Sequence, residues 1–172
     1  MDTGLLPNLL GFAGVSMNVL WPFLRTRSAM LVAQAVGAGL FGLHYALVGA
    51  WTGALMTGLA GAQALLAIPL GTRPGFRKVY IGMLPVIAAG LVLTWHGPAS
   101  AFAAVAMAIV SLGRYQVDVL WFRGLLIACV PMWVGHNLIV GSIPGLTSDV
   151  MTVASGGYMF WVTWKQERIP NG

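Results

Sequence analysis

Charged residues are scarce in this chain of 172 residues. Only 8% are Asp, Glu, Lys or Arg, whereas a soluble globular domain has about 25%. Hydrophobic residues make up 58% of the chain, and the mean hydropathy is strongly positive. The low charge excludes an ordinary soluble domain, and the high hydrophobicity excludes intrinsic disorder. The sequence therefore predicts a protein whose solvent is largely the lipid bilayer.

Cysteine and the usual catalytic motifs are also lacking. Cys129 is the only cysteine, so the chain cannot form an internal disulfide. There is no phosphate-binding glycine-rich loop, no CxxC pair and no HExxH sequence, so we predict that the protein is not an enzyme. The net charge of +5 comes from cations that flank apolar stretches. That pattern indicates membrane topology and argues against nucleic acid as a partner.

Seven apolar stretches are candidates for membrane-spanning helices, each of which needs about 20 apolar residues. The predicted spans are Leu5–Leu24, Ser28–Val48, Thr52–Leu70, Tyr80–Trp95, Pro98–Leu112, Leu120–Val140 and Pro144–Trp164. The fifth is the shortest and can be extended from Gly113 to Val117. Residues 1–172 then form a single transmembrane domain of the all-α class, with no soluble part.

The cations and tryptophans support this count of spans. All nine Lys and Arg residues follow the odd-numbered spans or begin the sixth: Arg25, Arg27, Arg73, Arg77, Lys78, Arg114, Arg123, Lys165 and Arg168. The intervening segments 49–51, 96–97 and 141–142 have none. Because positive loops stay inside, the N-terminus is predicted outside and the C-terminus inside. Most of the tryptophans lie near span ends, as in an aromatic belt; Trp133 is the exception.

A shift of 92 residues aligns one part of the chain with another. Residues 44–53 then lie on 136–145, with a His, a Val and two Gly matched. The shift carries the second span onto the sixth and the third onto the seventh, so the halves have the same orientation. This predicts a parallel repeat about an axis along the membrane normal. Its layout is three helices (5–70), a linker helix (80–95) and three helices (98–164).

The segment WVGHNLIVGSIPG, from Trp133 to Gly145, resembles the hallmark of YgjV-type bacterial inner membrane proteins. These carry a similar W-x-x-H-N…G-S-x-x-G stretch followed by an acidic residue, here Asp149. The length and repeat layout are similar to the MtN3/SWEET/PQ-loop group, which are seven-helix, N-out carriers of small solutes. The resemblance implies a multi-pass protein of the bacterial inner membrane with a SWEET-like fold. The chain departs from that group in lacking the PQ dipeptide and a hinge proline in its second and fifth spans.

Polar residues near the outer span ends form the first candidate site. His44 and His136 sit roughly 6 Å below those ends and Asp149 about 7 Å below. His136 and Asp149 would then be level on one hairpin, where pairing removes the cost of burying either alone. We predict a gate or proton-sensitive group made of His44, His136, Asn137 and Asp149. The alternative is structural: His44, His136 or Asn137 bonds loop backbone, and a His136–Asp149 pair pins the hairpin.

A second group of polar residues lies deeper and is predicted to bind substrate. It consists of Asn18, Gln34, Gln63, Trp133 and Ser155. Gln63 and Ser155 are equivalent in the repeat and lie roughly 17 Å deep, near the midplane. Trp133 is included because its N–H needs a partner away from the interface. The alternative is helix packing through interhelical hydrogen bonds, worth about 0.6 kcal/mol each.

Three functions are compatible with these patterns. We favour a membrane carrier or facilitator of a small neutral or weakly charged polar solute, bound near the midplane between the repeats, because no central charged ligand is apparent. The alternative is a non-transporting receptor or accessory protein that binds a ligand or partner. Haem or metal binding through His44 and His136, with Asp149, is less favoured, and no cofactor is otherwise implied. The expected partners are the lipid bilayer and a small-molecule solute. The sequence leaves open whether the chain forms a homo-oligomer.

Overall fold

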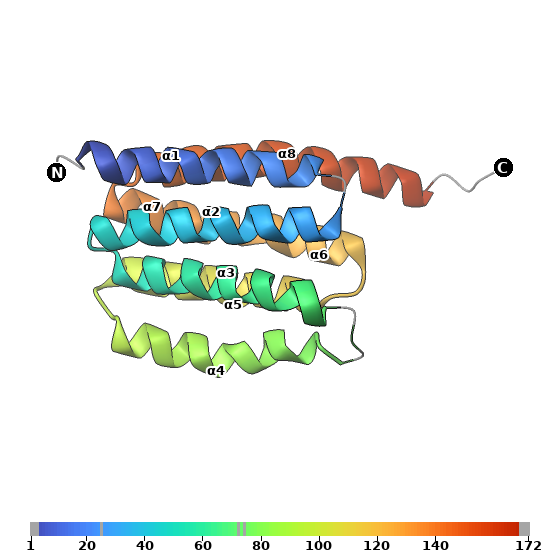
Figure 1. Cartoon of the computed structure of the whole chain (residues 1–172), viewed down its shortest axis with the longest axis horizontal. Helices are drawn as coiled ribbons and strands as arrows, with labels where there is room; N and C mark the ends of the chain where they lie inside the picture. Colours follow the sequence, from blue (N-terminus) through green and yellow to red (C-terminus); the bar gives the residue numbers. More distant parts are fainter. Residues whose placement is uncertain (1–3, 25, 72, 74, 169–172) are drawn as a thin grey trace.

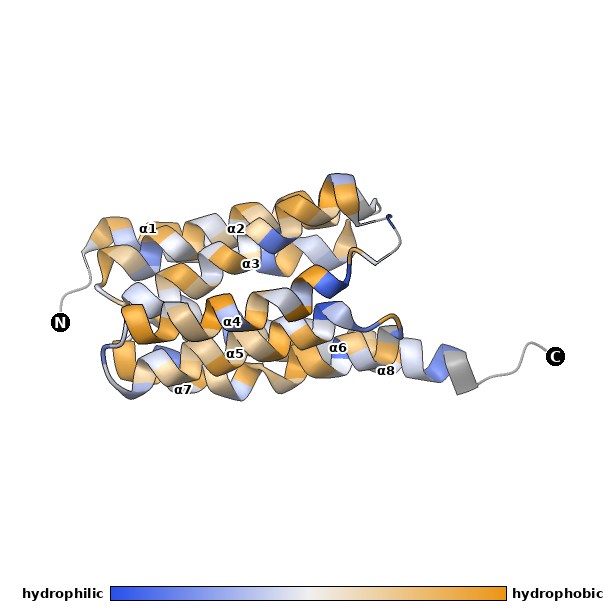
Figure 2. Cartoon of the chain, turned by 90° about the horizontal axis from the view of Figure 1, so that it is seen from below, coloured by the Kyte–Doolittle hydropathy of each residue, from blue (hydrophilic) through white to orange (hydrophobic). Residues whose placement is uncertain are grey.

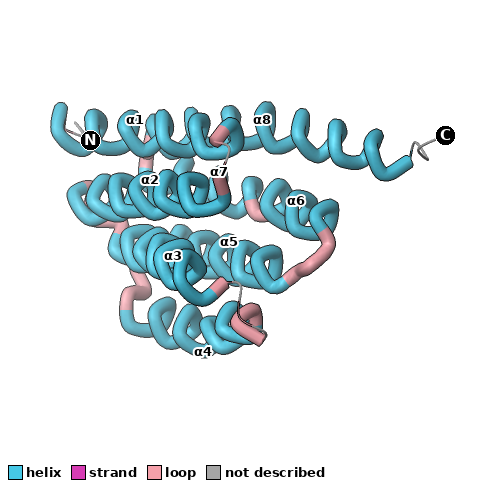
Figure 3. The backbone as a smooth tube through the Cα atoms, turned by 45° about the vertical axis from the view of Figure 1, so that its right-hand side comes forward, coloured by secondary structure: helices cyan, strands magenta, loops and turns pink. Residues whose placement is uncertain are grey.

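The computed structural model describes residues 4–24, 26–71, 73 and 75–168. Within that part of the chain every regular element is a helix, which confirms the all-α class. The elements are α1 (Leu5–Leu20), η1 (Trp21–Phe23), α2 (Arg27–Leu47), α3 (Trp51–Leu70), α4 (Lys78–Leu93), α5 (Pro98–Tyr115), α6 (Val119–Ala128), α7 (Val130–Val140) and α8 (Ile143–Arg168). Short loops join them (Figure 3). Because α6 and α7 follow one another with a break at Cys129, the described helices form seven rods, one for each predicted span.

Four helical segments are long and apolar enough to cross a membrane, judged by length and composition. They are Ser28–Leu47, Trp51–Leu70, Pro98–Tyr115 and Leu120–Val140. The α4 helix is apolar but has only 16 residues, and α1 also has 16. The rods run side by side along one long axis (Figure 1).

Prolines shift several boundaries from those that the sequence predicts. The first span is expected to be one helix, Leu5–Leu24, but α1 ends at Leu20 and continues as the 3₁₀ turn η1. Pro22 lacks an N–H and its ring clashes with a carbonyl one turn back. Pro131 has the same effect in the sixth span, which breaks at Cys129. The short fifth span does gain residues beyond its predicted end, since α5 runs to Tyr115.

The burial pattern is that of a protein with an apolar outside and a partly polar inside. Leu5, Val92 and Leu93 are 78%, 76% and 84% exposed, while several polar side chains are almost completely buried. The latter include His44, Gln63, His136, Asn137 and Ser142. In a bilayer this arrangement turns apolar surface to lipid and places hydrogen-bonding groups where protein partners satisfy them.

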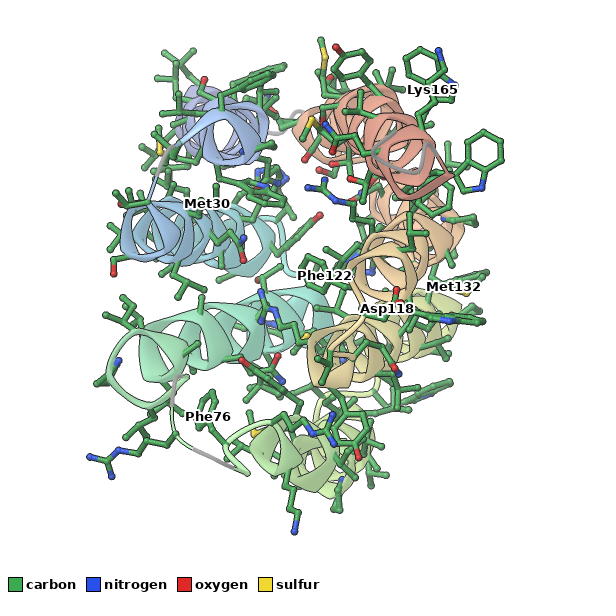
Figure 4. All side chains as sticks on the ribbon, turned by 90° about the vertical axis from the view of Figure 1, so that its right-hand side faces the viewer. Met30, Phe76, Asp118, Phe122, Met132 and Lys165 are labelled. Atoms are coloured by element: carbon green, nitrogen blue, oxygen red, sulfur yellow. The ribbon has the colours of Figure 1, made fainter. Side chains whose placement is uncertain are left out.

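Six rods form a closed ring, and α4 stands outside it. In the ring, α1 packs against α2, α2 against α3, and α3 against α5. The ring continues from α5 to α6 and α7, then to α8, and closes where α8 packs against α1. The α4 helix contacts α5 and α3 from outside. Figure 4 shows the ring seen along the helix axes, with α4 packed on its outside below α3 and α5.

The two ends of the ring differ in charge. The α1–α2, α3–α4 and α5–α6 loops and the C-terminal end of α8 lie at one end, which we call the basic end (Figure 1). Arg73, Arg77, Lys78 and Lys165 are exposed there, and Figure 2 shows hydrophilic segments gathered at this end. Arg25 lies outside the described residues, as do the side chains of Arg27 and Arg168. The α2–α3, α4–α5 and α7–α8 loops lie at the other end, which we call the neutral end because they contain no Lys or Arg.

Candidate functional site

A cavity of about 230 Å³ lies inside the ring and receives side chains from all six of its rods. Its lining begins near the basic end with Pro22, Arg123 and Met159 and reaches Trp133 and Asp149 in the interior. In Figure 4, Phe122 of the lining lies toward the middle of the ring. The volume is below the roughly 300–1,000 Å³ of pockets for drug-sized ligands, so the cavity suits a small metabolite.

A smaller cavity of about 80 Å³ continues toward the neutral end and shares Trp133 and Asp149 with the first. Three aromatic rings from α2 and α7 form its wall. The Tyr45 ring stacks on Phe41 at a centroid distance of 5.8 Å and on Trp133 at 6.1 Å. Phe41 and Trp133 thus line this cavity, with Tyr45 between them.

Asn137 joins the two halves of the chain on the side of the cavities that faces the neutral end. Its Nδ2 donates to Asp149 Oδ2 at 2.8 Å, and its Oδ1 accepts from the Tyr45 hydroxyl at 2.8 Å. All three side chains are buried. Sequence reasoning placed Asn137 and Asp149 in a gate but missed Tyr45. The signal was available, because Tyr45 is the residue that the 92-residue shift lays on Asn137.

The pairing of His136 with Asp149 does not form, so that part of the prediction is wrong. His136 Nδ1 bonds the Ala99 carbonyl of α5 at 2.9 Å, and the carboxylate of Asp149 is held by Asn137 instead. Successive residues on a helix are about 100° apart, so His136 turns toward α5 while Asn137 turns toward α8. His136 Nε2 is buried and has no hydrogen-bond partner in the described part of the chain.

His44 is fixed by a chain of hydrogen bonds at the neutral end. Gly145 N–H donates to Ser142 Oγ at 3.0 Å, and Ser142 Oγ lies 2.8 Å from His44 Nε2. His44 Nδ1 bonds the Pro7 carbonyl at 2.8 Å. A carbonyl can only accept, so Nδ1 carries the proton and the neutral ring accepts from Ser142 at Nε2. His44 thus ties α1 and α2 to the α7–α8 loop, although its backbone partner belongs to α1 and not to a loop as the structural alternative expected.

The two histidines do not converge on a common point. His44 Nε2 meets Ser142 of the second half, whereas His136 Nε2 faces Gly53 of the first, where an added Cβ would lie 2.5 Å away. The Tyr45 ring contacts both imidazoles, at 5.2 and 5.1 Å. Among the described residues no three His, Cys, Asp or Glu side chains are grouped to hold a metal. This geometry does not favour haem or metal binding through paired histidines.

The deeper polar residues divide into a cavity-facing set and one residue behind the wall. Asn18, Gln34, Trp133 and Ser155 line the larger cavity, and the Asn18 amide also donates to Ser148 Oγ at 2.9 Å. Ser155 bonds the Met151 carbonyl of its own helix. Gln63 does not line the cavity. It is 1% exposed and its amide is engaged by Ser111 and Arg114.

Arg114 is the most important residue that the sequence analysis placed elsewhere. We expected it in a basic loop, but it lies in the last turn of α5 and its guanidinium reaches back into the wall. Nη1 donates to the Ala60 carbonyl and to Gln63 Oε1, both at 2.9 Å, and Nη2 donates to Gln34 Oε1 at 3.3 Å. The signal was the predicted extension of the fifth span past Gly113, which brings Arg114 into a helix.

A family model with the description "Imp-YgjV: Bacterial inner membrane protein" matches residues 5–167, nearly the whole chain. No curated protein and no solved structure gives a match. The residues on which the resemblance rested, from Trp133 to Gly145 with Asp149, cover the cavity on its side toward the neutral end.

Proposed function

We propose that this chain, which belongs to the Imp-YgjV family of bacterial inner membrane proteins, carries a small polar solute across that membrane. One observation carries the proposal: the larger cavity lies inside the ring, its lining extends to the basic end, and buried hydrogen bonds cover it toward the neutral end. Carriers bind their solute near the midplane and expose the site to one side at a time. A cavity that is covered at one end fits one such state.

The proposed 3+1+3 layout is supported by contacts that recur with the predicted shift of 92 residues. His44 bonds the Pro7 carbonyl and His136 bonds the Ala99 carbonyl, and both members of one pair are 92 residues from those of the other. Gly49 and Gly141 close their helices with φ values of 78° and 71°. The ring order is also unchanged when α1, α2 and α3 are exchanged with α5, α6–α7 and α8. In this layout α4 is the linker.

The proposed orientation follows from the cations at the basic end. Loops rich in Lys and Arg stay in the cytoplasm, so the basic end would face inward and the N-terminus outward. The cavity would then be accessible from the cytoplasm, and release to the other side would require the neutral end to separate. The contacts that must break are Tyr45–Asn137 and His44–Ser142, and also Thr52–Ser100 between α3 and α5.

A reversible cross-link at the neutral end tests transport. Thr52 of α3 and Ser100 of α5 have their hydroxyl oxygens 2.8 Å apart, close enough for two cysteines at these positions to be bridged. The variant is Thr52→Cys with Ser100→Cys in a Cys129→Ala background, reconstituted in vesicles. The probes are succinate, succinamide, glycerol 3-phosphate, glycerol, nicotinate and nicotinamide. We expect flux of at least one probe, its loss on oxidation, and its recovery on reduction.

Controls separate the lock from damage to the fold. The single variants Thr52→Cys and Ser100→Cys should keep their flux under oxidation. Flux that persists in the fully cross-linked double variant would refute alternating access at the neutral end. Specific binding of a probe, with no flux in the reduced protein, would favour the receptor or accessory role in place of a carrier.

A further inference from the structure

The larger cavity contains more positive than negative charge. Its lining includes two guanidinium groups, Arg114 and Arg123, and one carboxyl group, Asp149. With Asp149 ionised the lining carries one uncompensated positive charge, and with Asp149 protonated it carries two. The remaining lining residues are neutral. A charged side chain inside a membrane protein is energetically costly when no opposite charge of the protein pairs with it. Such a side chain by default marks a substrate or ion pathway.

Asp149 does not neutralise either arginine by contact. Its carboxylate accepts from the Asn137 amide. The donors of Arg114 go to a carbonyl and two amide oxygens, which are neutral acceptors, so its charge is solvated but not balanced. The three acceptors come from α2 and α3 and hold the guanidinium in one position. This leaves Arg114 as a preorganised positive group in the wall of the cavity.

Arg123 is the less satisfied of the two arginines. Its Nε is buried and has no hydrogen-bond partner within the residues that the structure describes. A buried donor without an acceptor costs about 1–3 kcal/mol. Such a cost persists where a ligand supplies the missing acceptor, since binding sites trade stability for function. Trp133 lines both cavities, and its indole N–H is a hydrogen-bond donor only.

We propose that the solute carries an oxyanion, a carboxylate or a phosphate, which binds Arg123 and then Arg114. The guanidinium fork matches both anions with paired N–H donors and is less strongly hydrated than an ammonium group. Arg123 lies nearer the basic end and Arg114 reaches the deeper polar layer, so the two mark successive positions on one path. This inference rests on the proposed function and makes the solute anionic, in place of the neutral or weakly charged solute expected from the sequence, because the cavity lining contains Arg114 and Arg123.

The first test compares acids with their neutral counterparts. Thermal unfolding of the detergent-purified protein is measured at pH 7.5 and constant ionic strength with each of three pairs. The pairs are succinate and succinamide, glycerol 3-phosphate and glycerol, and nicotinate and nicotinamide. We expect at least one acid to raise the unfolding temperature by about 3–5 °C at ten times its Kd, and its neutral counterpart to have no effect.

Two substitutions of arginine by glutamine assign the effect to the cavity. In Arg123→Gln the shift with the acid should vanish, while the protein without ligand should unfold at the same temperature or higher, because an unsatisfied donor is removed. Arg73→Gln is the matched control: it removes the same charge from the exposed surface of the basic end and should keep the full shift. Arg123→Lys keeps the charge but lacks the paired donors of the guanidinium group, so it should retain only part of the shift in unfolding temperature.

Several results would overturn the inference. They are equal shifts with acid and neutral partner, no shift with any acid, an unchanged shift in Arg123→Gln, and loss of the shift in Arg73→Gln. A lipid headgroup offers the same oxyanion, so the measurement is repeated in nanodiscs of phosphatidylcholine with and without phosphatidylglycerol. If phosphatidylglycerol alone produces the Arg123-dependent shift, the site belongs to lipid and the solute assignment fails.

Flux measurements keep this inference separate from the proposed function. If vesicles transport only the neutral probes, the carrier proposal stands and the anion proposal fails. If an acid binds through Arg123 without flux in reduced protein, the anion site stands and the carrier proposal fails.

Discussion

Replacing Ala50 with Ser should stabilise the protein by giving His136 the partner that His44 already has. Ser142, at the start of α8, accepts from Gly145 N–H and meets His44 Nε2. Ala50 is 92 residues before Ser142 and occupies the same place at the start of α3, where no side chain caps the helix. A serine there would accept from the backbone N–H of Gly53 and donate to His136 Nε2, which now has no described partner.

The size of the effect follows from these two bonds. A serine N-cap is worth about 0.5–2 kcal/mol relative to alanine, and a net hydrogen bond about 0.5–1.5 kcal/mol. Because the new side chain must be ordered, we expect Ala50→Ser to raise the free energy of unfolding by about 1–2 kcal/mol. The reverse change, Ser142→Ala, strands His44 Nε2 and uncaps α8, and should cost about 2–3 kcal/mol.

Thermal unfolding in detergent measures both changes, at about 2–4 °C for each kcal/mol in a protein of this size. Ala50→Cys is the control, since it adds a side chain of similar size that forms only weak hydrogen bonds. The reasoning is refuted if Ala50→Ser is no more stable than Ala50→Cys while Ser142→Ala is destabilised. In that case the start of α3 and the start of α8 do not share the geometry that the repeat requires.

Three further substitutions, with Gly157→Ala as a control, test the residues that cover the cavity and form its wall, by the same unfolding measurement. Tyr45→Phe removes one buried hydrogen bond and should cost about 1–2 kcal/mol; no loss would mean that this contact does not hold the halves together. In Gly145→Ala the new Cβ meets the Asn137 amide, so this substitution should lower the free energy of unfolding by about 1–3 kcal/mol. An added Cβ at Gly157 has open space, so Gly157→Ala should leave the stability unchanged or raise it. Equal effects of the two substitutions would contradict the close approach of Gly145 to Asn137. Gln63→Leu takes a buried acceptor from Arg114 and should cost about 1–3 kcal/mol, and an unchanged stability would show that the guanidinium finds another acceptor.

The helices could be predicted from the sequence because each depends on a local property, the length of an apolar run. Their ends were harder to predict, since one proline decides whether a helix continues, as Pro22 and Pro131 show. The partners within the site could not be predicted from depth alone. His136 and Asp149 were expected to pair because both lie near the outer span ends, yet rotation around the helix turned His136 toward Ala99.

Arg114 shows the same limit for charge. Counted along the chain, it belongs with the basic loops, and the positive-inside rule treats it as a topological signal. Its side chain is long enough to extend from the last turn of α5 to the Ala60 carbonyl, so its charge lies deeper than its Cα. Long cationic side chains separate the place of the backbone from the place of the charge. Only a structure shows which of the nine cations point inward.

The two halves of the proposed repeat contribute different chemistry to the cavity. Its three charged groups, Arg114, Arg123 and Asp149, all belong to the second half of the chain. With the shift of 92 residues, the corresponding residues of the first half are Pro22, Leu31 and Thr57, none of which is charged. If the proposed repeat is present, its asymmetric lining cannot offer a solute two equivalent orientations. An anionic solute would therefore bind with its charged group toward α5 and α6 and its neutral part toward the amides of α1 and α2.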